Sequence, residues 1–194
     1  MTKIIGLTGG IGSGKTAIAK HIESLGIPVY IADVEAKKIL ETQEVIDEVA
    51  SVFGKDILEN GKIDKKKIAN LVFQNPEMLK TYNGIVHPEV FLHFQNWAKA
   101  HANFPILVKE AAILFESGSY VDCDKIILVT APKEVRIQRV MKRDGLSKEA
   151  IEHRMANQWD DEKKKSMSDY VIENIDLEKA KKSAEYIISL LRNQ

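Results

Sequence analysis

Short apolar runs alternate with segments of helical periodicity along most of this chain. The apolar runs predict strands at residues 4–8, 28–31, 105–108, 126–130 and 170–172. Helical patterns lie between most of them, which is typical of βαβ units. The alternation predicts an α/β fold in which a mostly parallel five-stranded sheet lies between two layers of helices.

The interval between the second and third predicted strands is unusually long. Residues 33–103 contain helical patterns at 45–53, 65–73 and 76–100, with a turn-rich break at 54–64. We expect this interval to form a mainly helical insertion beside the sheet.

A glycine-rich run joins the first predicted strand to the first helix. Residues 9–16 read GGIGSGKT, which fits the phosphate-loop pattern G-x-x-x-x-G-K-[ST]. Glycine allows backbone N–H groups to approach a phosphate closely, and a helix N-terminus favours an anion. The strand before the loop, the spacing within it and the helix after it all fit the phosphate-loop arrangement, so we predict the three-layer P-loop NTPase fold. The predicted nucleotide contacts are Gly10, Ile11, Gly12, Ser13, Gly14, Lys15 and Thr16.

Two side chains of the loop have predicted roles of their own. Lys15 reaches the terminal phosphates of a nucleotide, and the hydroxyl of Thr16 is a ligand for Mg²⁺. The loop therefore indicates an enzyme or switch that uses ATP or GTP with magnesium.

Composition excludes several other classes of protein. The 194 residues suit one domain with embellishments, and 28 basic residues balance 28 acidic ones. This balance gives no global positive field for nucleic acid. The only cysteine, Cys123, rules out an internal disulfide, and no run of about twenty apolar residues predicts a membrane span. The chain enters a strand almost at once, so we expect no signal peptide and a cytoplasmic protein.

Two carboxylates follow predicted strands, at the sheet edge where ligands of open α/β folds bind. Asp33 is suited to accept a proton from an attacking hydroxyl or to hold a magnesium-bound water, and equally to cap a helix over 34–40. Glu110 follows the third strand and suits the metal's water shell, although Lys109 interrupts the apolar run. A helix cap or surface salt bridge is nearly as good an interpretation of Glu110.

A basic helix is predicted over residues 132–145. Arg139 and Arg143 lie four residues apart on one face, where guanidinium groups can bind phosphoryl oxygens with two hydrogen bonds at once. The alternative is a favourable interaction with the helix C-terminus. The polar stretch 147–168 has the character of a lid over ATP, whereas Lys163, Lys164 and Lys165 are expected to be solvated.

The remaining distinctive side chains are predicted to be structural. A lone histidine such as His87 is more often a hydrogen-bonding partner than a catalyst, and the five histidines show no metal-ligand spacing. Trp97 and Trp159 lie in helical patterns and are expected to pack.

Several short motifs, taken in order, resemble the dephospho-CoA kinase family. They are GLTGGIGSGKT at 6–16, AD at 32–33, FG at 53–54 with GKID at 61–64, VHP at 86–88, LFESG at 114–118, QR at 138–139 with RD at 143–144, and DYVIEN at 169–174. The resemblance covers nearly the whole chain. The loop occurs in many families, whereas the VHP, LFESG and DYVIEN motifs together are specific.

The resemblance implies ATP-dependent phosphorylation of the ribose 3′-hydroxyl of dephospho-CoA, the last step of coenzyme A synthesis. It implies that Asp33 is the general base, that Lys15 and the loop hold the phosphates, and that Arg139 and Arg143 are cationic contacts on the lid side. Thr8 and His87 would line the acceptor site, and Asn174 would approach the adenine. The expected organisation is a single kinase domain, with a nucleotide core at 1–32, 104–137 and 168–194, an acceptor insertion at 33–103 and a lid at 138–167.

The chain departs from the family pattern at three places. Ile31 replaces the first carboxylate of D-A-D, Ala112 replaces a proline, and Lys65 replaces an arginine after Asp64. The last change weakens any bidentate contact there. Two alternatives to the family function are another P-loop kinase for a nucleoside, nucleotide or small metabolite, and a GTP-dependent switch. The switch is disfavoured because no N-K-x-D element is present.

Overall fold

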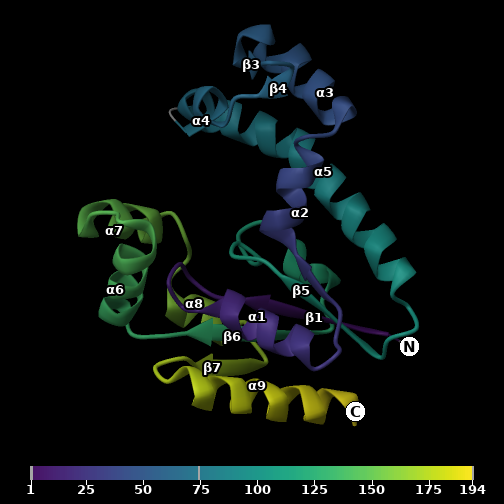
Figure 1. Cartoon of the computed structure of the whole chain (residues 1–194), viewed down its shortest axis with the longest axis vertical. Helices are drawn as coiled ribbons and strands as arrows, with labels where there is room; N and C mark the ends of the chain where they lie inside the picture. Colours follow the sequence, from purple (N-terminus) through teal and green to yellow (C-terminus); the bar gives the residue numbers. More distant parts are fainter. Residues whose placement is uncertain (1, 74, 194) are drawn as a thin grey trace. The chain divides into compact units, whose positions relative to one another are not determined.

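The computed structural model describes residues 2–73 and 75–193 (Figure 1). The chain forms two compact units. One comprises the chain up to Ile31 and from Ala100 onward, and the other comprises Ala32–Lys99. We call them the nucleotide unit and the helical unit.

The nucleotide unit is built on five strands, and every neighbouring pair is parallel. The strands are β1 (Lys3–Thr8), β2 (Val29–Ile31), β5 (Ile106–Glu110), β6 (Lys125–Thr130) and β7 (Tyr170–Glu173). Their order in the sheet is β2-β5-β1-β6-β7. This confirms the predicted parallel sheet. β5 continues through Lys109 and Glu110, which are buried, so the polar residues do not end the strand.

Side chains alternate between the two faces of this sheet. One face packs on α1 (Lys15–Ser24) and α9 (Leu177–Arg192), whose buried aliphatic residues join the strands in one cluster. Ile5, Leu7 and Ile127 belong to this cluster and are fully buried. This cluster fixes the strand that carries the glycine-rich loop.

The rest of the nucleotide unit follows the strands β5 and β6. It consists of a 3₁₀ turn at Ser119–Asp122, α6 (Lys133–Asp144), α7 (Lys148–Ala156) and α8 (Asp161–Ser166). Helices thus lie on both sides of the sheet, as predicted (Figure 1). α7 begins at a Ser147 cap and α8 at an Asp160 cap, since each side chain accepts a backbone N–H of the first turn.

The helical unit has its own apolar core. It contains α2 (Ala32–Ile39), α3 (Gln43–Phe53), a 3₁₀ turn at Lys55–Ile57, α4 (Lys65–Phe73) and α5 (Pro76–Ala100). Val45, Val49 and Ile68 are buried in its cluster. These helices confirm the mainly helical insertion.

The break predicted at 54–64 contains an unpredicted hairpin. Its strands are β3 (Leu58–Glu59) and β4 (Lys62–Ile63), which pair antiparallel. Asn60 and Gly61 join them with φ of 52° and 76°, the positive values that a tight two-residue hairpin turn needs.

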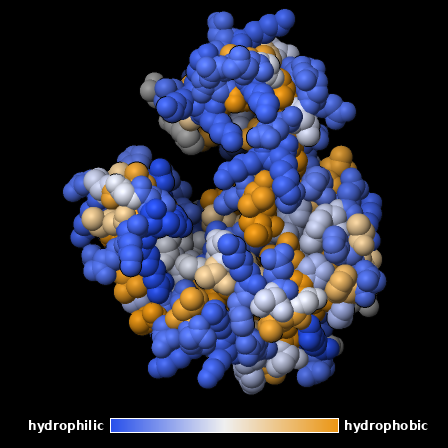
Figure 2. Space-filling model, in the orientation of Figure 1, coloured by the Kyte–Doolittle hydropathy of each residue, from blue (hydrophilic) through white to orange (hydrophobic). Residues whose placement is uncertain are grey.

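The surface is mostly hydrophilic on the side that Figure 2 draws. Hydrophobic residues on this side lie in separate patches. Among the helices of the described residues, none is both long and apolar enough to cross a membrane.

Candidate active site

The glycine-rich loop follows the central strand β1 and leads into α1. It turns on a hydrogen bond from the Ser13 N–H to the Gly10 carbonyl, at 3.0 Å. Gly12 and Gly14 have φ of 80° and 90°, which L side chains rarely adopt. A Cβ on Gly14 would also lie 2.1 Å from Nδ2 of Asn174. The loop therefore requires glycine at this position for two reasons.

Lys15, at the start of α1, forms an ion pair with Glu110 at the end of β5. The side chain of Glu110 is 1% exposed and that of Lys15 is 13% exposed. The pairing of β1 with β5 places the carboxylate here, because Glu110 is in register with Leu7, which lies just before the loop. The sequence left open whether Glu110 was a cap or a surface ion pair. It is neither, since it lies buried beside the loop lysine.

Asn174 and Arg139 both lie beside Gly14. Asn174 donates from Nδ2 to the Ser13 carbonyl at 2.8 Å, and Nη1 of Arg139 would be 3.9 Å from a Cβ on Gly14. Arg139 also donates to the Ile175 carbonyl at 3.2 Å. Its Nη1 is buried and has no hydrogen-bond acceptor in the described parts of the chain. Two predicted site residues from distant motifs thus meet at the loop.

Arg136 lies against the opposite end of the loop. A Cβ on Gly10 would be 2.8 Å from Nη1 of Arg136, and that guanidinium is nearly buried. Asp161 accepts from Arg136 Nη1 at 2.6 Å and from the Thr130 hydroxyl at 2.8 Å. The Arg136–Asp161 pair therefore supports the loop at Gly10.

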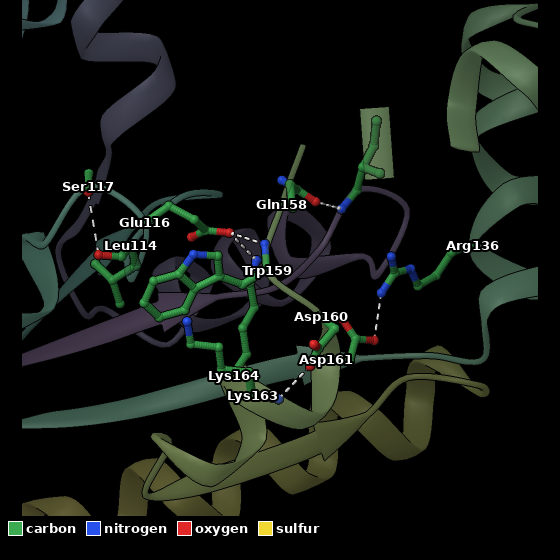
Figure 3. A network of polar contacts seen from close by, with 11 residues as sticks. Leu114, Glu116, Ser117, Arg136, Gln158, Trp159, Asp160, Asp161, Lys163 and Lys164 are labelled. Carbon is green, nitrogen blue, oxygen red and sulfur yellow. Dashed lines mark hydrogen bonds and ion pairs between the residues drawn. The ribbon is translucent and has the colours of Figure 1, made fainter. Parts of the chain in front are cut away.

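The LFESG motif contacts the residues before and within α8 (Figure 3). Glu116 accepts from the Trp159 N–H at 3.0 Å, and its carboxylate is 2.9 Å from Nζ of Lys164. Lys164 is fully buried, so its predicted solvated position is wrong. The orientation of α8 explains this burial, because it points one of the three lysines at 163–165 toward Glu116.

Both tryptophans pack, as predicted. The ring of Trp159 stacks on Phe115 with centroids 6.3 Å apart, and Nζ of Lys163 lies 3.3 Å from the Trp159 ring centroid. Trp97 stacks on Phe94 with centroids 6.2 Å apart.

Asp33 and His87 belong to the helical unit. Asp33 lies within the first turn of α2, so the alternative of a cap preceding the helix is wrong. It follows Ile31 by two residues in the chain, and Ile31 is in register with Glu110. His87 lies on the exposed side of α5, where partial loss of hydration lowers its pKa below the ordinary value. Their predicted roles stay predictions.

Three further predicted residues lie in the nucleotide unit. Thr8 ends β1 and is fully buried. Thr16 is exposed in the first turn of α1. Arg143 is exposed on α6, where Nε and Nη2 donate to the Asp144 carboxylate at 2.7 and 2.9 Å. The roles that the resemblance implies for these residues stay predictions.

Sequence reasoning missed the residues that support the loop, namely Arg136, Gln158, Asp161, Glu116 and Lys164. Gln158 accepts from the backbone N–H of Ile11 at 3.0 Å. Such polar residues carry no periodic signal. The available signals were the LFESG motif itself and, within 158–165, a run of acidic residues followed directly by a run of lysines.

Comparison with known proteins supports the same interpretation of the site. The model of the dephospho-CoA kinase family matches residues 3–179. A dephospho-CoA kinase of Fusobacterium nucleatum is 41% identical over 172 residues, which cover 88% of this chain and 89% of that protein. TT1252 from Thermus thermophilus has a TM-score of 0.88 at 34% identity and covers 98% of both chains. The dephospho-CoA kinase from Campylobacter jejuni has a TM-score of 0.67 at 26% identity, over 100% of this chain and 99% of its own.

A parallel sheet of this order, with a phosphate loop after its central strand and before a helix, defines a P-loop kinase. The chain belongs to the dephospho-CoA kinase family. It is accordingly an ATP-dependent transferase.

Proposed function

We propose that this protein transfers the γ-phosphoryl group of ATP to the ribose 3′-hydroxyl of dephospho-CoA and so produces coenzyme A. The observation that carries the proposal is the extent of the family match, residues 3–179, which includes both the phosphate loop and the whole helical unit. A match to the loop alone would leave the acceptor open. We place the reaction in the cytoplasm.

The loop and its neighbours hold ATP in this proposal. Backbone N–H groups at the start of α1 bind the phosphates, and Lys15 exchanges its contact with Glu110 for the terminal phosphates. Arg139 meets charge that develops during transfer, and its buried Nη1 is a suitable donor. Asn174 is in contact with the loop, and in this proposal it approaches the adenine. Arg143 completes the cationic contacts from α6.

Magnesium fits this site as an ion carried with the nucleotide. Among the described residues there is no group of three or more His, Cys, Asp or Glu side chains that could hold a metal. Mg²⁺ commonly takes its ligands from substrate phosphates, water and one or two protein groups. The exposed Thr16 hydroxyl would be the direct protein ligand, with Asp33 or Glu110 acting through water. When bound, the ion offsets negative charge on the β and γ phosphates.

The acceptor hydroxyl is activated by Asp33 in this proposal. A carboxylate that accepts the hydroxyl proton and aligns the oxygen contributes mainly in the transition state. Thr8 and His87 contact dephospho-CoA in this proposal, and desolvation lowers the pKa of His87, which favours its neutral imidazole. The segment 138–167 forms the lid over ATP in this proposal and limits access of water, with its residues 158–164 held in place by Glu116.

Acceptor selection tests this function. The purified chain is given Mg²⁺-ATP with dephospho-CoA, AMP or shikimate in separate reactions, and ADP release is measured. We expect turnover with dephospho-CoA at least about 100-fold above the other two acceptors, because missing polar contacts in a fitted site cost several kcal/mol. Equal or faster turnover with AMP or shikimate would assign the chain to another kinase activity.

A further inference from the structure

The segment from Gln158 to Lys164 reaches the phosphate loop in two ways, directly through Gln158 and indirectly through the contact of Asp161 with Arg136. Gln158 accepts the backbone N–H of Ile11 at 3.0 Å. Asp161 holds Arg136 at 2.6 Å, and that guanidinium lies against Gly10. Two consecutive loop residues, Gly10 and Ile11, therefore depend on where this segment lies. Figure 3 shows the segment passing between the loop and the LFESG motif.

Glu116 holds the segment at two residues, Trp159, which lies between these two contacts, and Lys164, which lies beyond them. Its Oε1 accepts the Trp159 N–H at 3.0 Å and lies 2.9 Å from Lys164 Nζ. Trp159 is the residue next to Gln158, and Lys164 lies three residues beyond Asp161. A single carboxylate oxygen thus holds the segment at one residue between its two loop contacts and at one residue beyond them.

The burial of this ion pair is difficult to explain by stability alone. Lys164 is 0% exposed and the Glu116 side chain is 14% exposed, so both charges lose most of their hydration. Oε2 of Glu116 is buried and accepts no hydrogen bond within the described ranges. A buried pair whose hydrogen-bonding capacity is incompletely used contributes little net stability, and its best-attested use is to specify one arrangement over others.

We propose that Glu116 is a positioning residue for ATP. Through Trp159 and Lys164 it fixes Gln158 and Asp161, and these hold Ile11 and Gly10 in the geometry that receives the nucleotide phosphates. The inference rests on one part of the proposed function, namely that the loop binds ATP. It gives the LFESG motif a role in nucleotide binding without contact between Glu116 and the nucleotide.

The first test is Glu116→Ala in the full chain. We expect the Kd for Mg²⁺-ATP, measured by calorimetry, and the KM for ATP to rise about tenfold, as for loss of one buried charged hydrogen bond. The KM for dephospho-CoA should stay within about twofold, because the proposed effect of Glu116 acts on the nucleotide loop. Glu116→Gln retains an acceptor for the Trp159 N–H and should recover about half of the loss in log Kd.

Trp159 reports the same change spectroscopically. The chain has two tryptophans, and Trp97→Phe leaves Trp159 as the only one. In that background we expect Glu116→Ala to shift the Trp159 emission to longer wavelength, since the segment is released and the ring gains water. An unchanged emission spectrum would contradict the proposed release.

A stability-matched control separates positioning from general loosening. Ile188 is 3% exposed in the α9 core, so Ile188→Ala lowers the free energy of unfolding without touching the segment. We expect its Kd for ATP to stay within about twofold of the unmodified chain. An equal rise in Kd for Ile188→Ala and Glu116→Ala would overturn the inference.

Coupling between variants tests the pathway from Glu116 to the loop. Gln158→Ala removes the contact with Ile11, and the double variant with Glu116→Ala should bind ATP little worse than Glu116→Ala alone, because Glu116→Ala already releases Gln158. Additive losses, or an unchanged Kd in Glu116→Ala, would overturn the inference. These results are distinct from failure of the proposed function, in which the unmodified chain itself does not bind Mg²⁺-ATP.

Discussion

Lys15, the first residue of α1, is paired with the buried carboxylate of Glu110 at the end of β5. Lys15→Ala removes both the cation that meets ATP and the cation beside Glu110. We expect kcat/KM for ATP to fall at least about 100-fold. We also expect the free energy of unfolding, measured in urea, to fall by about 3 kcal/mol, because Glu110 lies away from water.

A double variant separates these two effects. Lys15→Met with Glu110→Gln removes both charges, so the free energy of unfolding should recover relative to Lys15→Ala. ATP use should remain low. Recovery of ATP use without any cation at position 15 would contradict the assignment of Lys15 to the phosphates.

Asp33→Asn tests the general base. The amide keeps the size of the side chain but cannot accept the hydroxyl proton, so we expect kcat to fall about 100-fold or more while the KM for ATP stays within about twofold. Glu35→Gln is the matched control, because Glu35 is another acidic residue in the first turn of α2. Steady-state kinetics of both variants provide the measurement, and near-normal turnover of Asp33→Asn would remove Asp33 from this role.

Gly14→Ala tests the tight approach of Asn174 to the loop. The new Cβ would lie 2.1 Å from Nδ2 of Asn174, and φ at this position is 90°. Gly26 has a similar φ of 79° and no atom within 4 Å of a built Cβ, so Gly26→Ala reproduces the strain alone. We expect Gly26→Ala to cost roughly 1–2 kcal/mol of stability with normal ATP binding. Gly14→Ala should lose measurable ATP binding by calorimetry, and normal binding there would show that the loop tolerates displacement of Asn174.

Arg139→Lys tests the planar contact on the lid side. Lysine keeps the charge but loses the fixed pair of N–H donors. We expect kcat to fall about tenfold or more with a smaller change in the KM for ATP. Lys142→Arg, at an exposed position of the same helix, should have normal kinetics. Normal kinetics of both variants would indicate that only the positive charge at position 139 matters.

Cys123 should react slowly in the folded chain. Burial raises the pKa of its thiol to about 11, although the charge of Lys109 acts in the opposite direction. At pH 8 we expect iodoacetamide to alkylate it about 100-fold more slowly than in urea-unfolded chain, measured by mass spectrometry. Because the pKa is raised on folding, stability is retained below pH 9 and falls as pH rises toward 11. Cys123→Ala should lack that part of the fall, and equal alkylation rates in both states would refute the burial.

The sheet and the helical unit could be predicted because their signals are periodic. Runs such as 126–130 are bounded by polar residues, and α5 carries a helical pattern over its whole length. The phosphate loop has fixed spacing, and this spacing predicts the roles of Lys15 and Thr16. A residue whose role is set by one short, continuous stretch of the chain can thus be predicted from the sequence.

The support of the loop could not be predicted from such patterns. Residues 163, 164 and 165 are all lysine, so the sequence does not show which of them is buried. The packing of α8 places Lys164 beside Glu116. The hairpin at 58–63 was missed because its strands are two residues long, although Asn60-Gly61 is a strong turn signal. Long-range packing therefore decides the first feature, whereas short strands concealed the second.

The position of the transferred phosphate tests the central claim most directly. Purified chain is incubated with Mg²⁺-ATP and dephospho-CoA, and the product is examined by phosphorus NMR against authentic coenzyme A. We predict one new phosphomonoester resonance, coupled to the proton at the ribose 3′ carbon. A phosphate on the 2′ carbon or on another hydroxyl, or ATP hydrolysis that leaves dephospho-CoA unmodified, would contradict the account.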